Sequence, residues 1–344
     1  MHNDLFDLLN QDAEEMANKI TFNDFFNNHS VLLTGASGLL GVNFLAYFAK
    51  LKILGINVDV TGIVHSDNSP AVNYFTKNAN VKFLKGNLTD MNFLESLGSY
   101  DVVIHAASYG QPGKFMADKL ATIKLNTTCT LALFDVLNKG GDFLFISTSE
   151  VYSGNEVMPY QEYQIGTTDP SHPRACYIEG KRCGEAITNI YRGMGVKASS
   201  ARLALAYGPG TRVDDQRVMN QFIQKALLTK KITLQDMGEA LRTYCYVSDA
   251  IEIMLNILYK GSRPVYNVGG NSRTSIVSLA RSIGEVLNVP VELPSNLIPM
   301  SDAPEDVSLS LELIKQDFGK TSYLALSDGL RKTIQWQKSL YEKK

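Results

Sequence analysis

A glycine-rich segment at residues 34–41 (TGASGLLG) constrains the fold of this chain more than any other feature. It lies between an apolar run at 31–35, which predicts a strand, and the sequence at 40–52, which predicts a helix. Glycines at such a turn let the backbone approach a ligand, and the free N–H groups of the helix start attract phosphate. The segment therefore predicts a dinucleotide pyrophosphate site, with a tight turn that binds nothing as the alternative.

Apolar strands and helical stretches alternate along the first two thirds of the chain. Continuous apolar strands separated by helices indicate a parallel sheet that is covered on both faces. The sequence therefore predicts an α/β fold with a Rossmann-type doubly wound parallel sheet, and a smaller mixed α/β lobe after residue 208, where the rhythm becomes irregular. Further strands are expected at 58–64, 81–87, 101–108, 142–149, 197–208 and 265–270, and helices at 121–139 and 175–194.

The same pattern predicts the boundaries of the parts. Residues 1–28 have apolar side chains at roughly helical spacing, which predicts an N-terminal helical extension that packs on the body or on a second subunit. Residues 29–204 form the predicted Rossmann domain, together with a return segment at 243–269. Residues 205–344 form the predicted smaller lobe.

The composition bears on compartment and partners. Hydrophobic residues make up 44% of the chain, and the formal net charge is −2 with no Lys/Arg-rich stretch, so neither nucleic acid nor an anionic membrane is an expected partner. The chain start lacks the features of a secretory signal, and no apolar run approaches the ~18 residues that span a bilayer. We therefore expect a cytoplasmic protein. Cys129, Cys176, Cys183 and Cys245 lack metal-ligand spacing, which predicts free thiols and no metal site.

The end of the second predicted strand bears on the choice of dinucleotide. A carboxylate about 20 residues after the glycine loop would bind the ribose hydroxyl of NAD, and Asp67 falls slightly late for that role. His65 and Ser66 could instead accommodate the extra phosphate of NADP. We expect NAD, with NADP as the alternative.

Tyr177 and Lys181 are four residues apart on a predicted helix, so their side chains share one face. A free tyrosine has a pKa near about 10, and a neighbouring ammonium together with an oxidised nicotinamide would favour the phenolate. The segment 145–152 (FISTSEVY) lies where a predicted strand ends, which is the edge at which open parallel sheets bind ligands. Its hydroxyls could bridge a substrate hydroxyl and the phenolate, and Glu150 could act as a second acid or base. A Ser/Thr-rich turn is the alternative interpretation.

These motifs, taken in order, resemble the extended short-chain dehydrogenase/reductases that act on nucleotide sugars, over residues from about 31 to about 270. Within that family the chain is most similar to UDP-glucuronate decarboxylases, on the segments 147–152, 174–182 (RACYIEGKR) and 217–223. The motifs that carry the family resemblance are TGASGLLG, HAAS (105–108), STSEVY (147–152), YIEGK (177–181), YGPG (207–210) and RTYCYVSDA (242–250).

The resemblance implies roles for the matching residues. Tyr177 is the expected base for the sugar C4 hydroxyl, Lys181 lowers its pKa and holds the nicotinamide ribose, and Thr148 hydrogen-bonds the same hydroxyl. Glu150 assists the step after oxidation, and Arg242 contacts the substrate diphosphate. The other residues expected to bind substrate are Ser149 and Arg217, alongside Glu150.

On the same basis NAD is assigned to residues 29–204, and the nucleotide sugar to the lobe at 205–344. The residues expected to line the cofactor site are Gly35, Ser37, Gly38, Leu39, Leu40, Gly41, Asp67, Asn87, Leu88, Ala106, Ala107, Ser108, Asn126, Tyr177 and Lys181.

The reaction that the resemblance implies is transient oxidation of the sugar C4 hydroxyl by NAD to a 4-keto intermediate, as in UDP-glucuronate decarboxylation. The chain departs from the family at Leu205, where an asparagine usually contacts the nucleotide, and at 302–310, which is acidic where decarboxylases are arginine-rich. Family dehydratases carry Asp at the position of Ser149. The alternatives are a 4-epimerase or 4,6-dehydratase, an NADP-linked 4-keto-sugar reductase, and a dinucleotide-binding regulator without turnover.

The family also suggests a homodimer that pairs two helices from each subunit. These helices would be 121–139 and 175–193. Their apolar residues fit either an interface or core packing, and are Leu131, Leu133, Phe134, Ile187 and Ile190.

Overall fold

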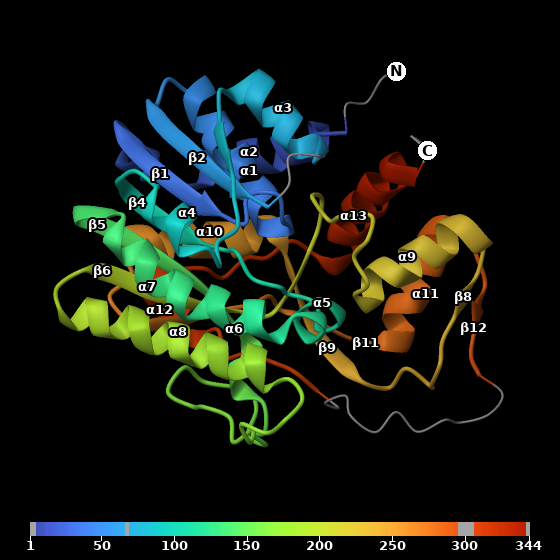
Figure 1. The fold of residues 1–344 in the computed structure, drawn as a ribbon. Coiled ribbons are helices and arrows are strands. Elements are labelled where there is room, and N and C mark those ends of the chain that lie inside the picture. Colours follow the sequence, from blue (N-terminus) through green and yellow to red (C-terminus); the bar gives the residue numbers. More distant parts are fainter. Residues whose placement is uncertain (1–4, 66–68, 295–305, 342–344) are drawn as a thin grey trace.

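A seven-stranded parallel sheet forms the centre of the protein in the computed structural model, which describes residues 5–65, 69–294 and 306–341 (Figure 1). Its strand order is β3-β2-β1-β4-β5-β6-β10, so the chain winds outward in both directions from the boundary between β1 and β4. This arrangement confirms the doubly wound Rossmann-type fold. The strands are β1 (His29–Thr34), β2 (Val58–Val64), β3 (Lys82–Lys85), β4 (Tyr100–His105), β5 (Leu137–Thr148), β6 (Lys197–Leu203) and β10 (Val265–Val268).

Helices cover both faces of this sheet because its central strands are apolar on both sides (Figure 1). One face packs against α2 (Leu39–Ile53), α3 (Pro70–Ala79), α10 (Val247–Lys260) and α12 (Glu312–Phe318), and α1 (Asp7–Lys19) packs outside them on α2 and α10. The other face packs against α4 (Met91–Glu95), α6 (Lys119–Asn126), α7 (Thr128–Asp135) and α8 (Ala175–Gly193).

The prediction of one continuous helix at 121–139 is wrong. The structure has two helices, α6 and α7, interrupted at Thr127, whose backbone lies at φ −119° and ψ −80°. The Thr127 hydroxyl donates to the carbonyl of Ile123, the kind of back-bonding by which threonine disturbs a helix. Residues 137–139 already belong to β5.

The strand predicted at 197–208 is likewise divided. After β6 the chain leaves the large sheet, and β7 (Leu205–Tyr207) pairs in parallel with β9 (Leu241–Tyr246). A three-stranded sheet in the order β11-β9-β7 results, and it confirms the smaller mixed lobe. The remaining elements of the lobe are α9 (Val218–Thr229), β8 (Ile232–Thr233), β11 (Ser272–Ser275), α11 (Ile276–Leu287), β12 (Val291–Glu292) and α13 (Leu326–Tyr341).

The domain boundaries stay a prediction, because the return segment at 243–269 is shared between the two sheets. β9 lies in the small sheet, whereas α10 and β10 pack on and extend the large one. The part of the chain that the structure describes contains no helix long and apolar enough to cross a membrane.

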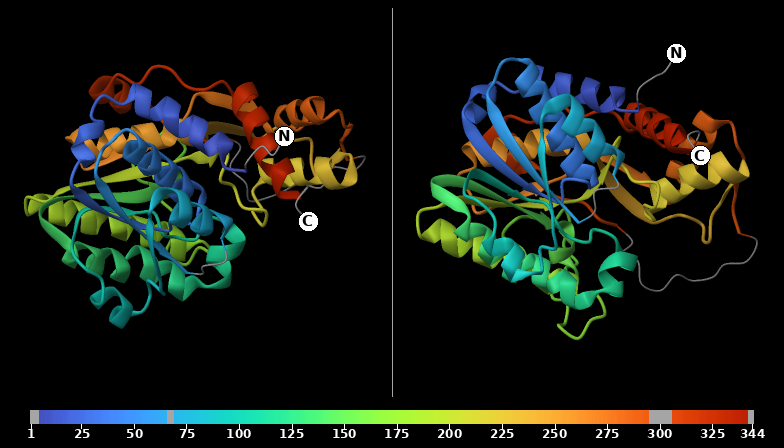
Figure 2. Two further views of the ribbon diagram at one scale, coloured as in Figure 1. Left: turned by 90° about the horizontal axis from the view of Figure 1, so that it is seen from above. Right: turned by 45° about the horizontal axis from the view of Figure 1, so that its top comes forward.

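The N-terminal helix α1 ties the two parts together. It lies on α2 and α10 and beside the C-terminal helix α13 (Figure 2). Its Asp12 is buried and accepts hydrogen bonds from the Tyr246 hydroxyl of β9 (2.6 Å) and the Lys332 ammonium of α13 (2.5 Å). Burial raises the pKa of this carboxyl, and the Lys332 contact opposes that rise. Three segments far apart in the sequence therefore meet at one carboxylate.

His105 at the end of β4 ties the glycine loop to the helical layer. Its Nε2–H donates to the carbonyl of Leu125 (2.9 Å), so Nδ1 accepts from the Thr34 hydroxyl (2.8 Å). Thr34 in turn accepts from the backbone N–H of Ala107 (3.0 Å). Burial, with a smaller effect of the Lys181 charge, lowers the pKa of His105 to about 3. The imidazole is therefore neutral throughout the physiological range.

This lowered pKa predicts a pH-dependent stability. The unfolded chain takes up a proton at His105 near pH 6.5 but the folded chain does not until about pH 3, so its contribution is complete above pH 6.5 and is lost on acidification. Urea unfolding should show His105→Gln losing less stability than the wild type between pH 6 and pH 4, by about 1.4 kcal/mol per pH unit. His172→Gln, at an exposed histidine, should follow the wild type. Parallel curves for wild type and His105→Gln would contradict the assignment.

Candidate active site

The glycine loop lies at the point where the strand order reverses, which is where doubly wound sheets bind ligands. Gly35 has a φ of +69°, and a Cβ there would lie 2.9 Å from backbone atoms of Ala106 and Ala107. A Cβ at Gly41 would overlap the carbonyl oxygen of Gly35. The helix α2 begins just after Gly38, so its free N–H groups face the same space. The loop thus presents bare backbone and a helix N-terminus.

Two polar atoms at positions predicted for the cofactor site are buried without a hydrogen-bond partner among the described residues. They are Oγ of Ser108, which follows β4, and Oδ1 of Asn126, at the end of α6. Buried polar groups are nearly always paired, so orphaned atoms at these positions fit a bound polar ligand. Bare backbone, helix N-terminus and orphaned polar atoms together suit a dinucleotide such as NAD.

The other residues predicted for the cofactor lie around the same edge. Ser37, Leu39, Leu40, Ala106 and Ala107 are half-buried in the glycine loop, the first turn of α2 and the end of β4. Asn87 is exposed and accepts hydrogen bonds from Thr89, and Leu88 is buried in the core. Asp67 lies outside the described residues.

Tyr177 and Lys181 lie on one face of α8, with the ammonium 6.0 Å from the centre of the phenol ring. The Lys181 Nζ donates to the carbonyl of Ile146 in β5 (2.6 Å) and is buried. Burial lowers the pKa of Lys181 to about 7, and the Glu185 charge opposes that effect. The pair is therefore anchored to the carboxyl end of β5, where Thr148 ends the strand.

The Tyr177 phenol is enclosed on several sides. Its side chain hydrogen-bonds that of Thr148, and its ring stacks on Phe115 of α5 (Pro112–Ala117) with centroids 4.6 Å apart. Burial raises the pKa of Tyr177 to about 12, and the Glu150 charge adds to this. The Thr148 hydrogen bond and the charges of Arg174 and Arg217 act in the opposite direction. Two cations that lower the pKa of this phenol, Arg174 and Arg217, therefore come from outside the Tyr177/Lys181 motif.

Glu150 lies in the short helix η2 (Ser149–Tyr152) directly after β5, with half-buried Ser149 beside it. Its carboxylate forms an ion pair with Arg174, the residue before α8. Burial raises the pKa of Glu150, and the charge and hydrogen bond of Arg174 oppose that rise. The Arg174 guanidinium also lies 5.4 Å from the centre of the Phe115 ring. Arg174 therefore bridges the acid and the aromatic cover of Tyr177.

Sequence reasoning missed a buried network behind Tyr177 and Lys181. Glu185 accepts from Ser147 (2.5 Å) and forms a buried ion pair with Arg202 of β6 (2.8 Å). Arg202 also donates to the Tyr152 hydroxyl (2.8 Å), which donates to Asn267 of β10 (2.7 Å). The one available signal was that Glu185 follows Lys181 by four residues and so shares its helix face.

The two arginines predicted to bind substrate belong to the small lobe. Arg217 precedes α9, pairs with Asp215 (2.6 Å) and donates to the carbonyl of Ala206 (3.0 Å). Arg242 lies on β9, is half-buried and donates to the carbonyl of Leu241 (2.6 Å). The positive charge of Arg217 lowers the pKa of Tyr177, against the larger effect of burial.

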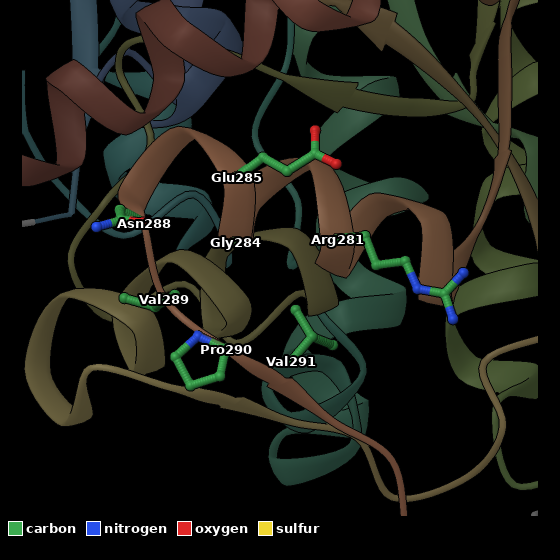
Figure 3. Close-up of a pocket in the computed structure, with 7 residues that line it drawn as sticks. All are labelled: Arg281, Gly284, Glu285, Asn288, Val289, Pro290 and Val291. Atoms are coloured by element: carbon green, nitrogen blue, oxygen red, sulfur yellow. The ribbon is translucent and has the colours of Figure 1, made fainter.

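A surface hollow elsewhere on the small lobe is separate from this site (Figure 3). It lies between α11 and β12, and the side chains of Arg281 and Glu285 extend in different directions around it. A small-molecule site needs convergent polar groups, and this hollow does not bring its charged groups together. None of the residues predicted for cofactor or substrate lines it.

A dinucleotide cradle at the switch point of a doubly wound sheet, with a tyrosine–lysine pair at the next strand end, defines a Rossmann-fold protein of the short-chain dehydrogenase/reductase type. The chain belongs to the NAD dependent epimerase/dehydratase family, whose sequence profile matches residues 31–269.

Known proteins resemble this chain over most of its length. It is 30% identical over 308 residues to UDP-glucuronic acid decarboxylase 1 of Xenopus tropicalis, covering 89% of this chain and 71% of that protein. Identity to UDP-glucuronic acid decarboxylase 6 of Arabidopsis thaliana is 28%, covering 89% and 88%. Among solved structures, UDP-glucose 4-epimerase of Thermotoga maritima aligns with a TM-score of 0.76 at 22% identity, covering 91% and 99%. WbmF of Bordetella bronchiseptica in complex with NAD+ aligns with a TM-score of 0.71 at 25% identity, covering 93% and 95%.

The packing of the glycine loop predicts that Gly41 tolerates no side chain. Gly41→Ala would push a methyl group into the Gly35 carbonyl, so the loop must shift, and NAD binding measured by calorimetry should weaken at least about tenfold. Gly98→Ala is the control, because nothing lies within 4 Å of a Cβ at that exposed position. NAD affinity that is equal in the two variants would show that the loop is not the pyrophosphate site.

Proposed function

We propose that this protein is an NAD-dependent enzyme that transiently oxidises the C4 hydroxyl of a nucleotide sugar, with UDP-glucuronate decarboxylation as the lead reaction. The observation that carries the proposal is the Tyr177 phenol, which is hydrogen-bonded to Thr148 and lies one helical turn from the buried Lys181. The relatives at 30% and 28% identity are UDP-glucuronic acid decarboxylases, which supports the lead reaction.

The residues around the glycine loop would hold NAD. The backbone of residues 35–41 and the start of α2 suit its pyrophosphate, and the orphaned polar atoms of Ser108 and Asn126 suit its polar groups. Lys181 would hold the nicotinamide ribose. When bound, NAD supplies the acceptor and donor of a hydride. WbmF, which resembles this chain, has been solved in complex with NAD+, which supports NAD as the cofactor; NADP stays the alternative.

Side chains of the protein accept and donate the protons of the reaction. Tyr177 takes the proton of the C4 hydroxyl while Thr148 holds that hydroxyl in hydrogen-bond reach of the phenol. Burial under Phe115 excludes water and raises the pKa of Tyr177 to about 12, so the site must favour the phenolate through its cations, which include Arg174 and Arg217. Glu150, held by Arg174, gives or takes a proton in the step that follows. The sugar then has a 4-keto group, which weakens the bonds at the neighbouring carbons.

A second candidate reaction is epimerisation at C4. It is kept because the acidic segment at 302–310 departs from the pattern expected of decarboxylases; at its described end, Asp306 forms an ion pair with Arg273 (2.6 Å). Ser149, at the position of the dehydratase aspartate, makes 4,6-dehydration a weaker candidate. An NADP-linked reductase and a regulator without turnover are distinguished from these by product analysis.

The decisive experiment is incubation with a panel of UDP-, dTDP-, GDP- and CDP-sugars. Mass spectrometry would show the loss of CO2 for a decarboxylase and of water for a dehydratase, and NMR would show an epimer of unchanged mass. Net consumption of NAD(P)H would identify a reductase. Tyr177→Phe should lower turnover about 10²- to 10⁴-fold and weaken NAD binding far less, because it removes the proton acceptor but keeps the aromatic ring. Tyr163→Phe, at an exposed tyrosine, is the control. Absence of turnover with every sugar would favour the regulator.

We further propose a homodimer through α6, α7 and α8. Leu133, Phe134 and Ile187 pack in the core, whereas Leu131 is 46% exposed and Ile190 is 62% exposed. Exposed apolar residues on neighbouring helices suit a second copy of the chain.

Ile190→Glu should therefore shift the molar mass measured by light scattering from dimer to monomer, because a charge would enter an apolar contact. Val286→Glu on α11, at a similarly exposed apolar residue, should leave the mass unchanged. A wild-type protein that is monomeric would disprove this interface.

A further inference from the structure

The helices α1 and α13 meet in a contact that joins the two parts of the protein (Figure 2). The buried Asp12 carboxylate of α1 accepts hydrogen bonds from the Lys332 ammonium of α13 (2.5 Å) and from the Tyr246 hydroxyl at the end of β9 (2.6 Å). At the start of α1, the Phe6 ring lies edge-on to the Trp336 indole of α13, with centroids 6.0 Å apart. We call this contact the clasp, and it consists of Phe6, Asp12, Tyr246, Lys332 and Trp336.

The two helices of the clasp belong to different parts of the molecule. α1 packs on α2 and α10, which cover the large sheet, and its Glu14 forms an ion pair with Lys50 of α2 (2.8 Å). α13 packs on α9, α11 and β9 in the small lobe, and its Gln337 donates to Asn220 of α9 (2.6 Å). The clasp is therefore a bridge from the helical layer of the large sheet to the small lobe.

A second contact of the clasp reaches the segment between β7 and α9. The Trp336 Nε1–H donates to the buried carbonyl of Thr211 (2.7 Å). Two residues earlier, the Pro209 carbonyl accepts from the Asn43 side chain of α2 (2.9 Å), the helix that begins at the glycine loop. The indole thus holds the lobe to a segment that is itself attached beside the cofactor cradle.

The chemistry of Asp12 suits a role in position more than in adhesion. Its side chain is only 1% exposed, and a buried carboxylate is costly unless it is paired and hydrogen-bonded. An apolar side chain would seal two helices without that cost. The bonds to Lys332 and Tyr246 form only when α1, α13 and β9 are in one relative position. The family profile covers residues 31–269, so both helices lie outside the matched range.

We propose that the clasp holds the small lobe in the position that completes the active site, and that Asp12 is the positioning residue of this clasp. The proposal rests on the proposed function, which assigns NAD to the large sheet and the nucleotide sugar to the small lobe. When the clasp is released, the lobe is correctly placed in only a fraction of the molecules. The apparent affinity for the sugar falls with that fraction, whereas a saturating sugar restores the placement and turnover is kept.

The first test compares carboxylates on one helix. Asp12→Ala removes both bonds to the lobe, whereas Glu14→Ala removes a bond between α1 and α2 and is the matched control. We expect Asp12→Ala to raise the KM for the nucleotide sugar about tenfold, which corresponds to about a tenth of the molecules having the lobe in place. Its kcat and its NAD affinity should match those of the wild type. Asp12→Asn keeps an acceptor for Tyr246 and should have a smaller effect on KM.

The second test needs no turnover, because Trp336 is the sole tryptophan of the chain and its fluorescence reports on the clasp. The indole is 5% exposed, so acrylamide should quench it little in the wild type and in Glu14→Ala. In Asp12→Ala we expect emission at longer wavelength and stronger quenching. Saturation with the preferred nucleotide sugar should reverse both changes, and NAD alone should not. Lys332→Gln carries the same prediction if Asp12→Ala does not fold, and thermal unfolding checks that each variant is folded at the temperature used.

Equal KM and equal quenching in the wild type, Asp12→Ala and Glu14→Ala would overturn the clasp and leave the proposed function standing. A lower kcat with unchanged KM, or a loss of NAD affinity, would also overturn it, because the damage would then lie in the site itself. A wild type that turns over no sugar would overturn the proposed function, whereas stronger quenching in Asp12→Ala than in Glu14→Ala would still support the clasp.

Discussion

The burial of the Lys181 ammonium is the constraint that organises the rest of the site. Removal of an ammonium from water costs several kcal/mol unless hydrogen bonds and an opposite charge compensate. The Ile146 carbonyl supplies the hydrogen bond at 2.6 Å, and Glu185 supplies the charge. Glu185 is held by Arg202 and Ser147, so α8, β5 and β6 are joined by one buried polar network. A network of this kind is satisfied in only one register of the three elements, and that register places Tyr177 next to Thr148.

The small lobe is attached to this network by contacts that start near the Tyr177 phenol. Phe115 stacks on Tyr177, and the residue before it, Lys114, forms an ion pair with Asp214 of the lobe (3.0 Å). The backbone N–H of Gln216 donates to the side chain of Gln111 (3.1 Å). On the opposite side, the N-terminal helix holds β9 through Asp12 and Tyr246. The arginines of the lobe are thereby fixed relative to the sheet from two directions.

Much of this arrangement could be predicted from sequence because its signals are local. The glycine loop is recognised from a strand, a turn and a helix that follow one another directly in the sequence. The spacing of Tyr177 and Lys181 places them on one helix face without any knowledge of the fold. The sheet follows from the apolar strands. The break at Thr127 could not be predicted in the same way, because helix propensity is weak and a single threonine does not end most helices. The split of the strand at 197–208 depends on β9, which lies more than thirty residues further along the chain.

The residues around Tyr177 and Lys181 were harder to predict because they are brought together by tertiary structure. Phe115 stacks on Tyr177 from a helix some sixty residues earlier in the chain, and no motif in the sequence around Phe115 predicts that contact.

The electrostatics of the phenol depend on the position of the small lobe. Burial raises the pKa of Tyr177 to about 12, and the charges that oppose this include Arg174, which belongs to the sheet side, and Arg217, which belongs to the lobe. Arg217 acts in the same direction on Tyr244, deep in the lobe. The charge of one guanidinium therefore acts on two phenols, Tyr177 at the sheet edge and Tyr244 in the core of the lobe. A lobe that moved away from the sheet would take with it part of the positive charge that makes Tyr177 a stronger acid, so the seating of the lobe and the basicity of the site are physically linked.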